Sequence, residues 1–147
     1  RLLFDPLGIP PEHCLRIAGE ADPEKEAGRC SEAVRGLLSP NGGPPRFDCA
    51  ILGVGTDLHT ASIFPHMPGL LDSEACYAVS RHPATGQRRI TLTGPPILNC
   101  AALLVGVVGK EKAEVVRSLR EGPWDESRPA SYLLFRARNA VVFSDVF

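Results

Sequence analysis

The sequence predicts an α/β fold with a mostly parallel, Rossmann-like sheet and helices on both faces. Residues 47–52 and 101–108 are nearly continuous apolar runs, as expected of parallel strands that are buried on both faces. Each run is followed by glycine and then by a segment that we expect to be helical, so the order strand, glycine, helix occurs twice. The length of 147 residues suits one domain, and we expect residues 1–147 to form it.

The first half of the chain contains one long helix and the first buried strand. Residues 14–17 follow a proline-rich connection and predict a short strand. From Pro23 through Leu38 apolar residues recur at helical spacing, with acidic residues in the first turn, which predicts an amphipathic helix. After the strand at 47–52, the turn at 53–55 leads into a short predicted helix that Pro65 ends.

The second half repeats strands and helices over shorter segments. We expect strands at 77–80, 90–93, 101–108 and 141–143, a short helix near 97–100, and a helix after Gly109.

The composition excludes several classes of partner. The 16 basic and 17 acidic residues nearly cancel, so no basic field is available to hold a nucleic acid. The apolar runs are too short to span a membrane. The five cysteines are widely spaced and odd in number, which argues against a disulfide framework and a zinc site and favours the reducing cytoplasm. We expect neither a metal nor a cofactor.

A candidate site follows the first buried strand and consists of four residues, Gly53, Gly55, Asp57 and His59. Ligands of open α/β sheets bind at the carboxyl ends of strands, where Gly53 and Gly55 permit a tight turn and close approach. Asp57 is suited to cap the predicted helix, and His59 in its first turn would be kept neutral by the helix dipole, as a general base requires. Taken singly, each residue also fits ordinary turn or capping chemistry.

The stretch 53–65, Gly-Val-Gly-Thr-Asp-Leu-His-Thr-Ala-Ser-Ile-Phe-Pro, resembles the G-x-G-x-D-G-H-T-A-S-L-F-P signature of the 6-phosphogluconolactonase family, within the glucosamine/galactosamine-6-phosphate isomerase superfamily. Further similar segments occur in the family's order at 16–20, 89–99, 109–113 and 129–131. The resemblance therefore covers nearly the whole chain and implies the NagB/RpiA/CoA-transferase-like fold.

The resemblance implies hydrolysis of 6-phospho-D-glucono-1,5-lactone to 6-phosphogluconate in the oxidative pentose phosphate pathway, without a metal. It implies that His59 acts as base and then acid, with Asp57 positioning it. Backbone N–H groups near Gly55 are the implied oxyanion donors, and we expect Gly53 and Gly55 to be among the residues that bind the substrate or its phosphate. Arg89 and Lys112 match the residues that bind the substrate phosphate, although both also fit ordinary exposed charges.

The sequence departs from the family pattern in two ways. Leu58 stands where the family usually has glycine, so it either strains a turn with positive φ or is simply a helical residue. The S-G-G-S-T-P-like loop and D-E-R-like strand that begin family members do not occur in these 147 residues. We therefore expect a domain that is incomplete at its N-terminus, with little or no lactonase activity on its own and a tendency to self-associate.

Two alternative functions stay open. One is a non-catalytic sugar-phosphate binding protein, a remnant of the enzyme. The other is a glucosamine-6-phosphate deaminase-like isomerase, although the continuation Thr-Ala-Ser-Ile-Phe-Pro at 60–65 favours the lactonase over the deaminase pattern.

Overall fold

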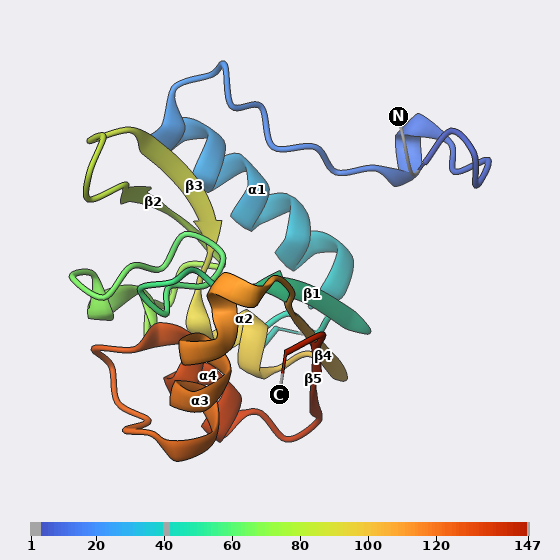
Figure 1. The fold of residues 1–147 in the computed structure, drawn as a ribbon. Coiled ribbons are helices and arrows are strands. Elements are labelled where there is room, and N and C mark those ends of the chain that lie inside the picture. The colour runs from blue at the N-terminus through green and yellow to red at the C-terminus, as the bar shows by residue number, and fades with distance from the viewer. Residues whose placement is uncertain (1–3, 40–41, 147) are drawn as a thin grey trace.

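The computed structural model describes residues 4–39 and 42–146 and contains two separate sheets (Figure 1). Strands β1 (Cys49–Gly53), β4 (Ala102–Val107) and β5 (Ala140–Ser144) form a parallel sheet in the order β1-β4-β5. Strands β2 (Tyr77–Arg81) and β3 (Arg88–Leu92) form an antiparallel pair. The predicted α/β class with a parallel sheet is confirmed.

The helices are mostly short. They are the 3₁₀ turn η1 (Pro11–His13), α1 (Pro23–Leu38), the 3₁₀ turn η2 (Pro68–Leu70), α2 (Gly94–Leu98), the 3₁₀ turn η3 (Lys110–Lys112), α3 (Ala113–Glu121) and α4 (Pro129–Arg136). Within residues 4–39 and 42–146, none of these helices combines the length and apolar character that crossing a bilayer would need.

Helix α1 has the predicted bounds because its sequence marks both its start and its buried face. Asp22 caps the N-terminus by accepting a hydrogen bond from the backbone N–H of Lys25 at 3.0 Å, and Pro23 occupies the first helical position. Ala27, Cys30 and Val34 recur at helical spacing and are buried. The helix packs against β2 and β3, above the parallel sheet in Figure 1.

The core lies on one face of the parallel sheet. Leu103, Val105 and Val107 of β4 alternate with less buried residues and pack with Ile97, Val115 and Leu133, which belong to α2, α3 and α4 respectively. Figure 1 shows these three helices together on one side of the strands.

The opposite face of the sheet is open to solvent, which differs from the prediction of helices on both faces. Ile51 is 79% exposed. Its register partner in β4 is Leu104, and the partner of Leu104 in β5 is Val141, which is 50% exposed. Phe143 continues this apolar stripe one row further and is 56% exposed. The apolar runs that predicted burial on both faces are therefore covered on only one side among the described residues.

Two further elements differ from the sequence-based expectation. Residues 14–17 are extended but belong to no strand, because they lie along α1 rather than beside another strand. Arg29 of α1 donates to the carbonyl of Arg16, and Glu26 accepts from the N–H of Ala18, the residue after this segment. The segment Pro129–Arg136 is a helix that we did not expect from its composition.

Candidate functional site

The candidate site is a turn at the carboxyl end of β1, and the short helix predicted there is wrong. Leu58 and Ala61 have positive φ values of 64° and 52°, which a right-handed helix excludes. Residues Val54, Thr60 and Ile63 form isolated β-bridges instead. Neither the capping role of Asp57 nor the helix-dipole effect on His59 therefore applies.

The turn brings Asp57 and His59 into direct contact. Nδ1 of His59 lies 2.5 Å from Oδ1 of Asp57, and the backbone N–H of His59 donates to the same oxygen at 3.2 Å. The backbone N–H of Gly55 donates to the carbonyl of His59 at 2.9 Å, which closes the turn. A Cβ on Gly55 would lie 2.2 Å from His59 Nδ1, so only glycine fits at this position.

These hydrogen bonds affect the carboxylate of Asp57. Burial alone would raise the pKa of Asp57, but the hydrogen bonds from the ring and backbone of His59 together outweigh it and hold the pKa below its ordinary value. Asp57 is therefore ionised at neutral pH and can only accept hydrogen bonds. Since its contact with the ring must be donated by His59, Nδ1 carries a proton, and in the neutral imidazole Nε2 is then the nitrogen with the lone pair.

The N–H of Gly55 is not available as an oxyanion donor. It is already bonded to the carbonyl of His59, so of the N–H groups expected near Gly55 this one is occupied within the turn. Gly53 differs, because a side chain there would meet no protein atom within 4 Å, and packing does not require glycine at this position.

Leu58, the residue that departs from the family signature, adopts the left-handed conformation and is also buried. Its side chain is 7% exposed and belongs to the hydrophobic core. Its carbonyl accepts a hydrogen bond from the N–H of Ala130 at 2.9 Å, which ties the turn to α4. Of the two roles considered for this position, the turn with positive φ is therefore the correct one.

Lys112 joins the turn from the end of η3. Its Nζ donates to the carbonyl of Val54 at 2.9 Å. A cavity of about 440 Å³ opens here, lined by Ile51, Leu52, Gly53, Val54, Gly55, His59, Ala61 and Lys112. The structure thus brings four of the six predicted site residues to one cavity, with Asp57 directly behind His59.

Arg89 lies on β3, outside the residues that line this cavity. Because side chains alternate along a strand, Arg89 leaves β3 on the same face as Thr91. Thr91 Oγ1 accepts a hydrogen bond from the N–H of Ser62 at 3.0 Å, so this face of β3 is turned toward the residues that follow His59.

The sequence did not reveal the aromatic support behind His59. Phe64 is 1% exposed, and its ring centroid lies 4.7 Å from that of His59 and 5.3 Å from that of His82. Thr60 Oγ1 donates to the carbonyl of Gly53 at 2.8 Å and holds the end of the turn to β1. In the sequence, the one sign of either contact was that Thr60 and Phe64 belong to the stretch 53–65, which resembles the family signature.

Comparisons with known proteins find matches along nearly the whole chain. Residues 1–143 match the family model described as glucosamine-6-phosphate isomerases/6-phosphogluconolactonase. The chain is 40% identical over 121 residues to a 6-phosphogluconolactonase of Treponema pallidum and 37% identical over 141 residues to one of Haemophilus influenzae. The crystal structure of devB protein covers 99% of the chain with a TM-score of 0.85 and 30% identity.

The chain is shorter than these proteins. The two alignments include 82% and 96% of this chain but 50% and 58% of the relatives, and the structural match includes 60% of the other chain. The chain therefore spans between half and three-fifths of the length of these three proteins.

Proposed function

This chain belongs to the family of glucosamine-6-phosphate isomerases and 6-phosphogluconolactonases, and we propose that its site hydrolyses 6-phospho-D-glucono-1,5-lactone to 6-phosphogluconate. The observation that supports the proposal best is the contact of His59 with an ionised Asp57 at the edge of a cavity. That cavity has the size of a small-molecule site.

In the proposed reaction His59 acts first as a base and then as an acid, with the same proton. A lactone carbonyl is already electrophilic, so the enzyme must mainly activate water and protonate the leaving ring oxygen. Nε2 of His59 takes a proton from water as the water oxygen attacks the carbonyl carbon. The imidazolium that forms is stabilised by Asp57 and returns the proton to the ring oxygen as the carbon–oxygen bond breaks.

Lys112 and Arg89 are proposed to bind the phosphate. An ammonium group has three hydrogen-bond donors, and Lys112 uses one on the carbonyl of Val54, which leaves two for a ligand in the cavity it lines. Arg89 is placed on a strand face directed toward the same turn, where a guanidinium suits forked contacts with phosphate oxygens.

Hydrolysis of 6-phosphogluconolactone above its spontaneous rate tests the role of His59. The chain spans little more than half of its relatives, so we expect a low rate for the 147 residues alone. The variant His59→Asn should reduce this rate to the spontaneous one, because removing a general base typically costs about 10²–10⁴-fold. His13→Asn, an exposed histidine on η1, is the matched control and should keep the parent rate.

Calorimetry with 6-phosphogluconate tests ligand binding separately. Lys112→Met should weaken binding about tenfold or more, whereas Lys110→Met, two residues away and exposed, should not. Binding without any hydrolysis would contradict the enzymatic proposal and favour a sugar-phosphate binding protein. Equal rates in the His59→Asn variant and the parent chain would contradict the assigned base.

Three further proposals concern the chain as a whole. We propose that residues 1–147 are part of one lactonase-like domain and that the chain works in the cytoplasm, since all five cysteines are free. We also propose that two copies associate through the open apolar face of the parallel sheet, which a symmetric dimer would cover on both copies.

A further inference from the structure

A second cavity lies at the opposite end of the parallel strands from His59. It has a volume of about 420 Å³ and is lined by short segments that directly precede the three strands. Arg46 comes three residues before β1, Cys100 two before β4, and Asn139 immediately before β5. The proposed catalytic turn follows β1, so the two cavities lie at opposite edges of the sheet.

Arginines dominate the charge of this cavity. Arg46, Arg136 and Arg138 line it, and no aspartate or glutamate does. Among the described residues, arginines 16, 29, 88 and 117 form ion pairs with glutamates, but none is found for the three arginines of the cavity. Since the whole sequence has a net charge of −1, three unneutralised arginines at one place are a local concentration of positive charge.

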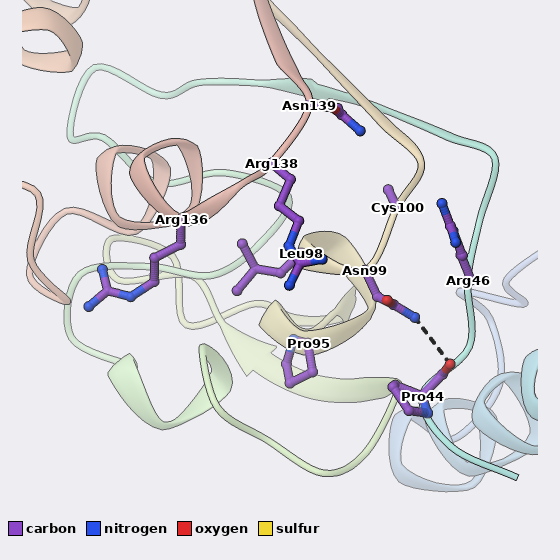
Figure 2. A pocket seen from close by; sticks show the side chains of 9 residues that line it. All are labelled: Pro44, Arg46, Pro95, Leu98, Asn99, Cys100, Arg136, Arg138 and Asn139. Atoms are coloured by element: carbon purple, nitrogen blue, oxygen red, sulfur yellow. Dashed lines mark hydrogen bonds between the residues drawn. The ribbon is translucent and has the colours of Figure 1, made fainter.

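The three arginines do not contribute equally. Arg136 stacks over the ring of Tyr132 at 3.7 Å, and in Figure 2 its guanidinium points away from the other two. Figure 2 shows Arg46 and Arg138 on either side of Asn99 and Cys100. A ligand in this cavity would therefore be held between Arg46 and Arg138, with Arg136 at the rim.

The cavity walls are held together by hydrogen bonds between distant segments. Asn99 donates through Nδ2 to the carbonyls of Pro44 and Pro45 at 3.2 and 3.1 Å. Asn139 donates through Nδ2 to the backbone carbonyl of Ala101 at 3.1 Å. The backbone carbonyl of Asn139 accepts from the N–H of Leu103 at 2.8 Å. The arginines thus extend from a braced framework, so binding would not have to order the backbone that carries them.

We propose that this cavity is a second binding site, separate from the catalytic turn, for a small anion that carries two phosphate groups. Guanidinium groups bind phosphate oxygens by forked, charge-assisted hydrogen bonds, and two arginines on opposite sides suit two anionic groups on one ligand. The volume is within the range of small-molecule sites.

Titration of the 147-residue chain with inorganic pyrophosphate tests the proposal by calorimetry. Arg46→Gln and Arg138→Gln should each weaken binding about tenfold or more, because each removes charged hydrogen bonds. Both arginines are exposed, so the replacements leave the core intact. Arg120→Gln, on the exposed surface of α3, should leave the affinity for pyrophosphate unchanged.

Alkylation of Cys100 gives a second measurement that locates the ligand. Cys100 lines the cavity and is partly exposed, so bound pyrophosphate should slow its reaction with a maleimide while leaving that of exposed Cys49 unchanged. Affinity that falls in Lys112→Met but not in the two arginine variants would overturn the proposal, because the anion would then occupy the catalytic turn. An absence of pyrophosphate binding would overturn it as well.

Discussion

At the scale of single residues, Leu58 combines a strained backbone with a well-packed side chain. A left-handed conformation costs a residue with a Cβ about 1–2 kcal/mol, yet the side chain of Leu58 is buried in the core and its carbonyl bonds to α4. Burial of a leucine is typically worth more, since Leu→Ala substitutions in cores cost about 2–5 kcal/mol. Packing therefore outweighs the strain, and the turn keeps its shape with leucine in this position.

Comparison of alanine and glycine at position 58 measures that strain. Leu58→Ala and Leu58→Gly both lose the buried side chain, but only glycine also relieves the positive φ. We expect the glycine variant to be more stable than the alanine variant by about 1 kcal/mol, as measured by urea unfolding. At Leu103, the second residue of β4, the order should be reversed. An alanine variant at position 58 that is as stable as the glycine variant would show that the turn relaxes when leucine is removed.

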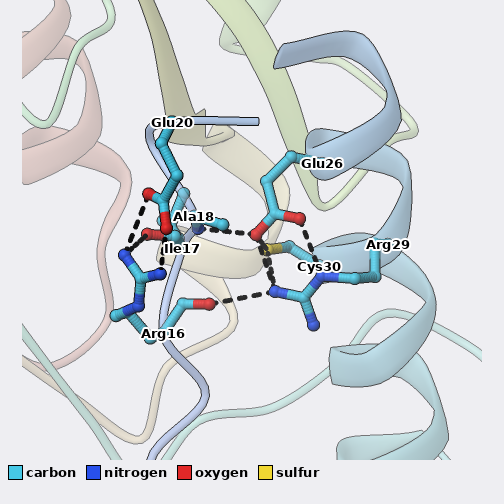
Figure 3. Close-up of polar contacts among 7 residues, drawn as sticks. All are labelled: Arg16, Ile17, Ala18, Glu20, Glu26, Arg29 and Cys30. Carbon is cyan, nitrogen blue, oxygen red and sulfur yellow. Dashed lines mark hydrogen bonds and ion pairs between the residues drawn. The ribbon is translucent and has the colours of Figure 1, made fainter. Parts of the chain in front are cut away.

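At the scale of elements, α1 is tied to the preceding extended chain by one buried glutamate (Figure 3). Glu26 accepts from Nε and Nη2 of Arg29 at 2.7 and 2.6 Å and from the N–H of Ala18 at 2.7 Å. Arg29 also donates to the carbonyl of Arg16 at 2.9 Å. These bonds, led by that from Arg29, lower the pKa of Glu26 to about 2 despite the opposing effect of burial.

The pH dependence of stability follows from that lowered pKa. A carboxylate whose pKa is lower in the folded chain stabilises it above the unfolded pKa of about 4.3, and loses this effect as the pH falls toward 2. Glu26→Gln should therefore lower the urea midpoint at pH 7, and its difference from the parent chain should shrink as the pH falls from 4 toward 2. Glu32→Gln, exposed on the same helix, is the control. A difference that stays constant over this range would contradict the assigned role of the charge.

The elements that sequence predicted well are those whose pattern is local. Helix α1 has a cap, an apolar stripe and a length that all lie within its own residues. The prediction of a helix after β1 was wrong because the shape of this turn depends on distant partners, such as Thr91 for Ser62 and Ala130 for Leu58. Helix α4 was missed because residues 129–133 are all buried, so no polar face reveals a helical period.

The candidate site was predicted through a short signature, whereas the arginine cavity was not. Asp57 and His59 are two residues apart, and the turn alone brings their side chains together. Arg46 and Arg138 are far apart in sequence and come to line one cavity only through the order of β1, β4 and β5. Sequence patterns reveal the first kind of cluster but not the second.

At the scale of the whole molecule, the parallel sheet exposes one apolar face. The register aligns Ile51 with Leu104 and Val141, and Phe143 extends the same stripe along β5. Strands that face solvent on one side usually alternate apolar and polar residues, but β1 and β5 carry apolar residues on both faces. Such a face favours association, because covering it removes apolar area from water.

A lysine on the open face tests the association of two copies. Phe143→Lys places a charge within the proposed contact, where it would have to be desolvated in the dimer. We expect analytical ultracentrifugation to show a concentration-dependent dimer for the parent chain and a dissociation constant at least about tenfold higher for the variant. Leu7→Lys is the control, since Leu7 is 64% exposed in the N-terminal segment away from the sheet (Figure 1). A parent chain that remains monomeric at high concentration, or a dimer unaffected by Phe143→Lys, would mean that this face is not the contact between copies.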